Sequence, residues 1–337
     1  MSDRQARNRA LPAERGVPDA RPALGGARST PAFALPDGAA SGLPAGLGTT
    51  RIGQRTFTWG SRTFVMGILN VTPDSFSGDG LLARVPTAAP AGPAGTVPTA
   101  VDLATAMAEA GADLLDIGGE STRPGHALVT LEDELARVIP VIVAVRAALP
   151  AMPLSVDTTK PAVAVAALDA GADLVNDVWG VADDDALARL AAERGTPIVL
   201  MHNRAEPRYT TLLPEIVADL QRAIERALRA GVAWDDIVVD PGFGFGKTAE
   251  HNLALLRDLG SLAILGRPIL LGTSRKSTLG RVLDLPADQR LEATLATTAL
   301  AIASGVDVLR VHDVRENVRA ARMADAVVRG AWPAEDA

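Results

Sequence analysis

The sequence predicts one α/β domain, a (β/α)8 barrel of the TIM type, and three observations lead to this fold class. Eight short apolar runs alternate with eight longer helical patterns between residues 63 and 328. Glycine-containing turns, such as residues 110–113, end helices and lead into the next run. Polar side chains follow every apolar run, at the end of the strands where barrels of this type carry their chemistry. An open doubly wound sheet is the alternative arrangement of the same units.

Residues 1–50 are predicted to be a disordered tail, because they are rich in Ala, Gly, Pro and Arg without a sustained apolar period. Residues 51–58 alternate in polarity, which favours a short strand or hairpin that closes the bottom of the barrel. The barrel domain is therefore predicted over residues 51–333.

The eight barrel strands and their helices follow in regular order. The predicted strands are residues 63–69, 114–117, 154–156, 174–175, 198–201, 237–239, 269–271 and 308–311. The predicted helices are residues 100–109, 131–148, 161–169, 185–193, 214–230, 250–259, 291–303 and 314–328.

Two segments depart from an ordinary barrel unit. Residues 291–303 are apolar on nearly every helical face, which indicates either a homodimer interface or a helix that is well covered within one chain. Residues 81–99 form a Pro-, Ala- and Gly-rich connection that is longer than usual, and we expect a mobile loop at the rim.

Composition excludes several classes of function. The net charge of -7 and the pI near 5.2 provide no basic field for nucleic acid or an anionic membrane. The chain has no cysteine, which excludes disulfides, thiolate metal sites and cysteine nucleophiles. No run is long enough to span a membrane, and the first residues lack an apolar signal core, so we expect a cytoplasmic protein.

Lysine is rare in this chain, which otherwise uses arginine. The lysines are Lys160, Lys247 and Lys276, and a lysine kept in such a sequence is mildly enriched for sites that need a compact ammonium.

Residues 237–247 form the stretch around which the site is predicted. An apolar strand ends at Asp240, and a carboxylate in that position must be paired with donors from the protein or from a ligand. The alternative is that Asp240 caps the amides of its own loop or the helix that begins near Thr248. Residues 242–247 match neither the dinucleotide fingerprint nor the spacing of a P-loop.

Polar side chains at the ends of all eight strands are expected to converge at one rim. A lone residue such as His202 is better explained as a hydrogen-bonded structural group. As a set, the residues favour a ligand with a heteroaromatic edge and an anionic group, whereas the scattered histidines disfavour zinc. The residues after the successive strands are Asn70 and Asp74, Asp116 and Glu120, Asp157 and Lys160, Asn176 and Asp177, His202 and Arg204, Asp240, Ser274 and Lys276, and Arg310 and His312.

Seven stretches, in this order, resemble the dihydropteroate synthase family of pterin-binding enzymes. They include Asn-Val-Thr-Pro-Asp-Ser-Phe at 70–76 and Asp-Pro-Gly-Phe-Gly-Phe-Gly-Lys at 240–247. The full set is residues 68–76, 116–125, 155–158, 176–178, 240–247, 272–277 and 310–313. The resemblance implies a transferase of folate biosynthesis and a sulfonamide target. It would condense hydroxymethyl-dihydropterin pyrophosphate with p-aminobenzoate and release dihydropteroate and pyrophosphate.

The resemblance also implies roles for individual residues. Asp240 would accept two parallel N–H bonds from the pterin, and Asn70 would be a protein ligand of Mg2+. The pterin-binding residues implied are Asp157, Asn176, Met201, Asp240, Phe245 and Lys276. The catalytic residues implied are Asn70, Lys276, Arg310 and His312. Asn70, Arg310 and His312 would gather the pyrophosphate, and Lys276 would donate to the ring carbonyl.

The p-aminobenzoate site is implied in the same way. Residues 71–80 and 120–125 resemble mobile lids, and the insertion at 81–99 departs from the family pattern. The residues expected around the aryl carboxylate are Phe76, Thr122, Arg123, Pro124 and Ser277.

Two other functions share part of this pattern. A pterin-barrel methyltransferase that acts on methyltetrahydrofolate with a corrinoid partner would share Asp157, Asn176 and Asp240, but would not need Arg123. A non-catalytic pterin-binding paralogue would not need the pyrophosphate residues.

Overall fold

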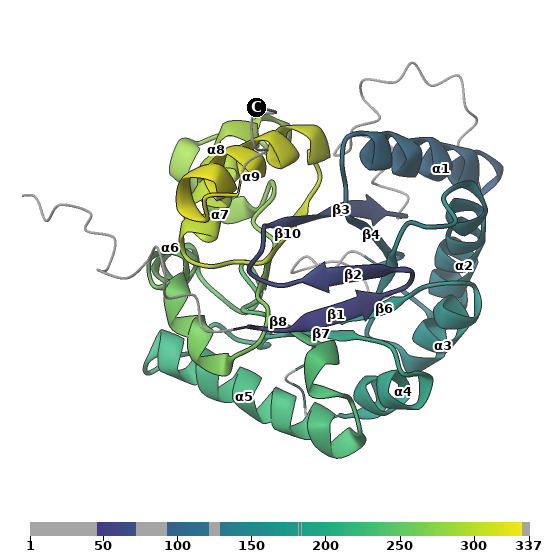
Figure 1. The fold of residues 1–337 in the computed structure, drawn as a ribbon, viewed down its shortest axis with the longest axis horizontal. Coiled ribbons are helices and arrows are strands. Elements are labelled where there is room, and N and C mark those ends of the chain that lie inside the picture. Colours follow the sequence, from purple (N-terminus) through teal and green to yellow (C-terminus); the bar gives the residue numbers. More distant parts are fainter. Residues whose placement is uncertain (1–45, 72–92, 121–128, 181, 183, 332–337) are drawn as a thin grey trace, which may run out of the picture. The chain divides into compact units, whose positions relative to one another are not determined.

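The computed structural model describes residues 46–71, 93–120, 129–180, 182 and 184–331. Eight parallel strands form a nearly closed barrel that helices surround (Figure 1). The strands are β3 (Phe64–Asn70), β4 (Leu114–Gly118), β5 (Leu154–Asp157), β6 (Leu174–Asp177), β7 (Ile198–Met201), β8 (Ile237–Asp240), β9 (Leu270–Leu271) and β10 (Val308–Val311). They pair in chain order from β3 to β8, β9 pairs with β10, and β10 returns to β3. A single bridge between Val239 and Ile269 closes the ring, which confirms the predicted barrel.

Helices follow the strands as predicted, with one addition. The α-helices are α1 (Pro93–Glu109), α2 (Leu131–Ala148), α3 (Pro161–Asp169), α4 (Ala186–Arg194), α5 (Leu212–Ala230), α6 (Ala249–Arg257), α7 (Ser277–Leu283), α8 (Leu291–Ala303) and α9 (Val314–Val328). Short 3-10 helices are η3 (Trp234–Asp236), η4 (Leu259–Leu265) and η5 (Ala287–Gln289). The sequence did not predict α7, which begins one residue after Lys276.

Helix α1 begins earlier than predicted. The sequence predicts a loop for its first seven residues, 93–99, because they are rich in Pro, Ala and Gly. Val97 and Ala100 nevertheless pack against or within the core, so this part of the segment is helical. Residues 81–92, the rest of the predicted rim loop, lie outside the described residues.

An antiparallel hairpin precedes the barrel and closes its amino-terminal end. Strands β1 (Thr49–Ile52) and β2 (Arg55–Thr58) lie across the ring in Figure 1. Phe57 packs on Trp59 and Phe64, with ring centroids 5.7 and 4.8 Å apart, and all three side chains are buried. The closing role of the hairpin is as predicted, but the folded chain starts before the predicted boundary at residue 51.

Helix α8 is less uniform than its sequence indicated. Its inner face combines three threonines with Ala301 and Ile302. Thr297 Oγ1 lies 2.8 Å from Thr273 Oγ1, and Thr298 Oγ1 donates to Asn317 at 2.7 Å. Its outer face exposes only Glu292 beside apolar residues, namely Ala296, Ala299, Leu300 and Ala303. Apolar residues therefore lie on both faces of α8, and a partner could cover those on the outer face.

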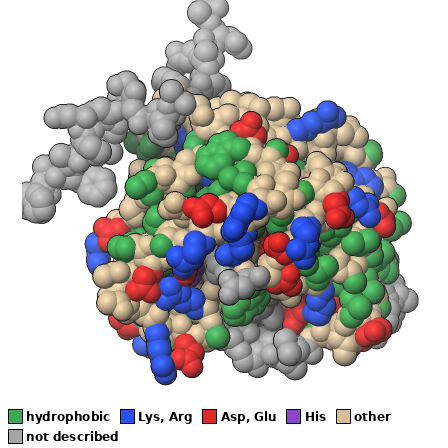
Figure 2. Space-filling model, turned by 90° about the horizontal axis from the view of Figure 1, so that it is seen from below, with side chains coloured by type: hydrophobic (Ala, Val, Ile, Leu, Met, Phe, Trp, Pro, Cys, Tyr) green, Lys and Arg blue, Asp and Glu red, His purple; other side chains and the backbone are tan. Residues whose placement is uncertain are grey.

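The distribution of charge on the surface agrees with the lack of a basic field expected from the composition. Figure 2 shows acidic and basic side chains interspersed over one face of the molecule, without a large area of a single sign. Among the described residues, no helix combines the length and the apolar character needed to cross a bilayer.

Candidate active site

The candidate site lies directly above an apolar layer inside the barrel. That layer contains one residue from most strands, together with the hairpin side chains. Because side chains alternate along a strand, the residue two positions later faces the same interior. The step leads from Leu114 to Asp116, from Leu174 to Asn176, from Val199 to Met201, from Val238 to Asp240 and from Val308 to Arg310. The barrel interior thus changes from apolar to polar within one step, toward the carboxyl ends of the strands.

Arg310 binds two carboxylates inside the barrel. Its Nε donates to Asp116 Oδ2 at 2.6 Å, and its Nη2 donates to Asp157 Oδ2 at 2.7 Å. Asn176 Nδ2 donates to the same Asp116 oxygen at 3.2 Å. The sequence predicted Arg310 near the pyrophosphate at the rim, whereas the guanidinium here lies among the residues predicted to hold the pterin.

Several acceptor atoms in this cluster have no partner. Asp116 Oδ1, Asp157 Oδ1 and Ser155 Oγ are buried, and none has a hydrogen bond within the described residues. Burial raises the pKa of Asp157 to about 7; the Arg310 charge opposes this shift, and the neighbouring Asp116 charge adds to it. Buried acceptors without donors are costly. The arrangement is therefore suited to a ligand that presents several N–H groups.

Asp240 ends β8 and is buried, as the sequence predicted. Its Oδ1 accepts the amide hydrogen of Gly242 at 2.7 Å, so it does cap its own loop. It does not cap α6, because Thr248 accepts from the amide of His251 and takes that role itself. Burial raises the pKa of Asp240, while the nearby Lys276 charge acts in the opposite direction.

The glycine-rich loop after β8 packs tightly on the segment after β7. Gly242, Gly244 and Gly246 all have positive φ, at 68°, 83° and 54°. A Cβ on Gly242 would overlap the carbonyl oxygen of His202, and one on Gly246 would overlap that of Arg204. The glycines are needed for this close backbone approach rather than for a phosphate cradle.

Lys276 reaches over this loop toward the site. Its Nζ donates to the carbonyl oxygen of Phe243 and lies 4.2 Å from the ring centroid of Phe245. Phe245 is partly buried, and Met201 is buried at the end of β7. The ammonium therefore has a fixed platform on the predicted pterin side of the barrel.

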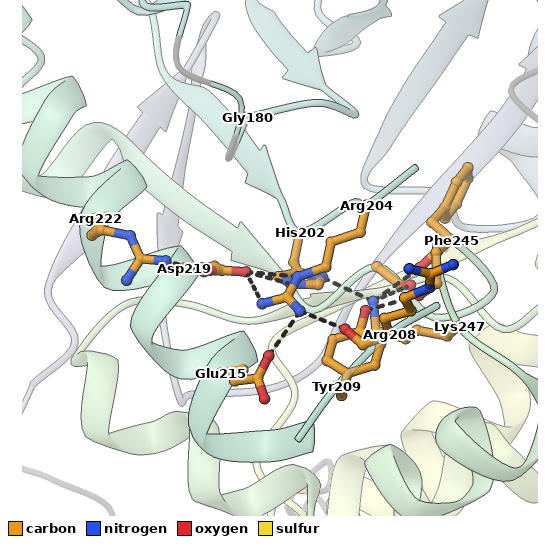
Figure 3. A network of polar contacts seen from close by, with 12 residues as sticks. Gly180, His202, Arg204, Arg208, Tyr209, Glu215, Asp219, Arg222, Phe245 and Lys247 are labelled. Atoms are coloured by element: carbon orange, nitrogen blue, oxygen red, sulfur yellow. Dashed lines mark hydrogen bonds and ion pairs between the residues drawn. The ribbon is translucent and has the colours of Figure 1, made fainter. Parts of the chain in front are cut away.

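His202 is a structural residue, which agrees with the preferred interpretation of it as a lone histidine. It is fully buried, and its Nε2 lies 3.1 Å from Asp219 Oδ2 while its Nδ1 lies 2.9 Å from Lys247 Nζ (Figure 3). Burial, aided by the Lys247 charge, lowers the pKa of His202 to about 3. The imidazole is therefore neutral near pH 7.

The remaining described residues of the predicted site lie at the rim. Asn70 is the last residue of β3 and is partly buried. His312 follows β10, and its Nδ1 lies 3.0 Å from Ser274 Oγ. Ser277 is exposed in the first turn of α7. The predicted aryl-site residues Phe76, Thr122, Arg123 and Pro124 lie outside the described residues, as do residues 72–80 and 121–125 of the predicted lids.

Two contributions were missed from the sequence. Asp116 was noted after the second strand but was given no role, although an acid inside an apolar strand is itself a signal. Lys247 was noted only as a rare lysine, and its partners come from two different loops.

Comparison with known proteins supports one family. A family model described as pterin binding enzyme matches residues 66–312. A dihydropteroate synthase from Clostridium beijerinckii is 46% identical over 280 residues, which cover 83% of this chain and 99% of that protein. The chain belongs to the dihydropteroate synthase family.

Solved structures of dihydropteroate synthases share the fold. One from Clostridium difficile, determined in the presence of pteroic acid, is 46% identical with a TM-score of 0.75 and covers 80% of this chain and 98% of that one. One from Xanthomonas albilineans, with 4-aminobenzoic acid, is 42% identical with a TM-score of 0.75 and covers 85% and 99%. The likeness to dihydropteroate synthases thus covers the whole barrel.

Proposed function

We propose that this chain condenses hydroxymethyl-dihydropterin pyrophosphate with p-aminobenzoate to form dihydropteroate and pyrophosphate, the reaction of dihydropteroate synthase in folate biosynthesis. The observation that carries the proposal is the buried cluster of Asp116, Asp157, Asn176 and Asp240 above the apolar layer, with acceptor oxygens that lack donors. Structures of related dihydropteroate synthases determined with pteroic acid or 4-aminobenzoic acid support a pterin and p-aminobenzoate as the two components that are joined.

The pterin would occupy the interior of the barrel. Asp240 can accept two parallel N–H bonds from the aminopyrimidinone edge, since Oδ2 and the second lone pair of Oδ1 remain available beside the Gly242 amide. Asp157 and Asn176 supply acceptors and a donor for the other ring nitrogens. Met201 and Phe245 would add apolar contacts, and Lys276 would donate to the ring carbonyl.

The pyrophosphate would lie toward the rim. For Arg310 to bind it, the guanidinium must exchange its carboxylate partners for phosphate oxygens, which its bidentate geometry suits. Asn70 and His312 are placed at the ends of β3 and β10, which are neighbours in the sheet. Together these residues would hold the leaving group beside the barrel mouth.

The chemical step is an alkyl transfer. The bond between the methylene carbon and the pyrophosphate oxygen breaks, and the electron pair leaves with the pyrophosphate. The amino nitrogen of p-aminobenzoate then bonds to that carbon and releases one proton to water. The cationic groups lower the barrier because negative charge grows on the pyrophosphate as the bond breaks.

We also propose Mg2+ as the cofactor, with Asn70 as its protein ligand. The described residues contain no group of three or more His, Asp or Glu side chains placed to hold a metal. This donor set fits an ion that is bound through substrate phosphates, water and one amide oxygen. Bound there, the ion would neutralise pyrophosphate charge.

A homodimer is proposed on separate grounds. The outer face of α8 exposes Leu300 among alanines, and the neighbouring helix α9 exposes Met323 and Val327. Large apolar side chains gathered on adjacent helices are typical of an interface between copies. Analytical ultracentrifugation tests this proposal.

The cytoplasmic location stays a prediction that cell fractionation tests.

Measuring pyrophosphate release tests the function. The purified chain is mixed with the pterin pyrophosphate, p-aminobenzoate and Mg2+, and each component is omitted in turn. Release that requires all three supports the synthase. Binding of the pterin without turnover would indicate a non-catalytic paralogue, and methyl transfer from methyltetrahydrofolate to a corrinoid would indicate the methyltransferase.

A further inference from the structure

Lys247 lies on the Phe245 side of the network in Figure 3, and its Nζ has three acceptors. Its Nζ lies 3.0 Å from the carbonyl oxygens of both Gly242 and Phe245 and 2.9 Å from Nδ1 of His202. Since Nδ1 accepts, His202 carries its proton on Nε2 and donates it to Asp219. Lys247 therefore ties the glycine-rich loop to a buried histidine.

The far end of this network is anchored on α5. Asp219 also accepts from Arg204 at 2.8 and 3.1 Å, and Arg204 in turn donates to Glu215 at 2.8 Å. Asp219 and Glu215 both belong to α5. The chain of contacts thus connects the loop after β8 to a long helix of the scaffold through the loop after β7.

The loop that Lys247 holds is the one that presents the pterin-side groups. Gly242 and Phe245, the two residues whose carbonyls bind Lys247, stand on either side of Phe243, whose carbonyl binds Lys276. The Phe245 ring also lies beneath the Lys276 ammonium, and the loop begins at Asp240. A change in the loop would therefore move the platform of Lys276 and the carboxylate of Asp240 together.

We propose that Lys247 is a positioning residue for the pterin-binding part of the site, which acts by holding the loop that places Lys276. The inference rests on the proposed function, because it assumes that Lys276 and Asp240 bind the pterin. We expect no contact between Lys247 and the substrate, because its Nζ is surrounded by three acceptors of the protein.

A lysine is required at this position for a geometric reason. Three acceptors converge on one nitrogen, which suits a tetrahedral ammonium, whereas the planar fork of arginine spreads its donors over three nitrogens. Burial, with the opposing attraction of Asp240, lowers the pKa of Lys247 to about 7. Burial therefore disfavours the charged form of Lys247, whereas the three acceptors around Nζ favour it.

The test measures substrate affinities of Lys247→Met and Lys247→Arg. We expect the dissociation constant of the pterin pyrophosphate, measured by calorimetry, to rise about tenfold in both, since a misplaced ammonium and carboxylate each lose a charge-assisted hydrogen bond. The KM for p-aminobenzoate at saturating pterin should stay within about twofold, because only the pterin contacts move. Pterin affinity unchanged in folded Lys247→Met would overturn the inference.

A double-mutant cycle separates positioning from general loss of structure. If Lys247 acts in part through Lys276, the double variant Lys247→Met/Lys276→Met loses less pterin affinity than the sum of the two single losses. Additive losses would reject the inference. Arg146→Met is the matched control, because Arg146 is a partly buried cation that donates to the carbonyls of Met152 and Gly171 at the other end of the barrel. It should lower stability without changing pterin affinity.

Two further measurements keep the outcome interpretable. If Lys247→Met does not fold, His202→Leu, which removes only one of the three acceptors, is judged by the same criteria. Turnover by the unmodified chain is measured first. Its absence contradicts the proposed function, whereas turnover with unchanged pterin affinity in the variants contradicts only the role of Lys247.

Discussion

Arg310 Nη2 donates to Asp157 Oδ2 at 2.7 Å, across the barrel interior from β10 to β5. Three steps around the sheet separate these strands, through β3 and β4. A cation thus occupies the space between carboxylates that a pterin is proposed to fill. Substrate binding must therefore replace an ion pair, rather than simply fill a pocket.

Arg310→Ala tests this exchange. We expect the variant to lose affinity for the pterin pyrophosphate by at least about tenfold, because it loses a bidentate phosphate donor. Affinity for the free pterin should change less, since removing the guanidinium also removes its competition for Asp157. Calorimetry with both ligands measures the difference. Equal losses would reject the assignment, and Arg329→Ala, at the hairpin end of the barrel, is the control.

Asp157→Asn tests the perturbed carboxyl group. Because the pKa of Asp157 in the folded chain is raised to about 7, the folded state holds its proton more tightly than the unfolded state. The contribution of this proton to the free energy of unfolding is fully present below about pH 4, and it is lost as the pH rises to about 7. The free energy of unfolding, measured with urea, should fall between pH 5 and pH 8. This fall should be smaller in the variant by about 2 kcal/mol. An exposed control, Asp288→Asn, should leave the difference unchanged.

Asp240→Asn should weaken pterin binding by about 2 kcal/mol or more, because one acceptor oxygen becomes a donor that faces a donor on the ligand. Calorimetry with free pterin measures this directly. The fold should persist, since an Asn oxygen can still accept from the Gly242 amide. Unchanged affinity would rule out the direct contact.

Gly242→Ala and Gly195→Ala form a matched pair. Both glycines have positive φ, at 68° and 59°, but a Cβ on Gly195 meets nothing within 4 Å. We expect Gly195→Ala to cost about 1 kcal/mol from backbone strain alone. Gly242→Ala should cost about 1–3 kcal/mol more, because its Cβ overlaps the carbonyl of His202. Similar urea midpoints for both variants would show that the approach of the two loops is not tight.

The strands and helices of the barrel could be predicted from the sequence because each depends on a pattern of neighbouring residues. Short apolar runs and glycine helix ends identified all eight strands within about two residues, and four helices matched at both ends. The polar layer could also be located, since Asp240 and Asn176 each stand two residues after an apolar residue, Val238 or Leu174, that faces the interior.

Elements whose local signal conflicts with their packing were missed. Helix α7 is only seven residues long and follows a site loop, so its period is too short to recognise. The first turns of α1 have a loop-like composition, and only tertiary contacts of Val97 explain their helical form.

Side-chain partners were the hardest to predict. Arg310 and Asp157 are 153 positions apart, and Lys247 and His202 are 45 apart. Alternation fixes which side of a strand a residue faces, but it does not fix how far a long side chain extends. Arg310 therefore reached carboxylates in the interior instead of the rim.

The hairpin of β1 and β2 gives the barrel a blind end, because Phe57 and Trp59 close the side opposite the polar layer. The two substrates and the two products would then enter and leave at the same end of the barrel. A departing pyrophosphate and an incoming pterin would therefore both pass the carboxyl ends of the strands.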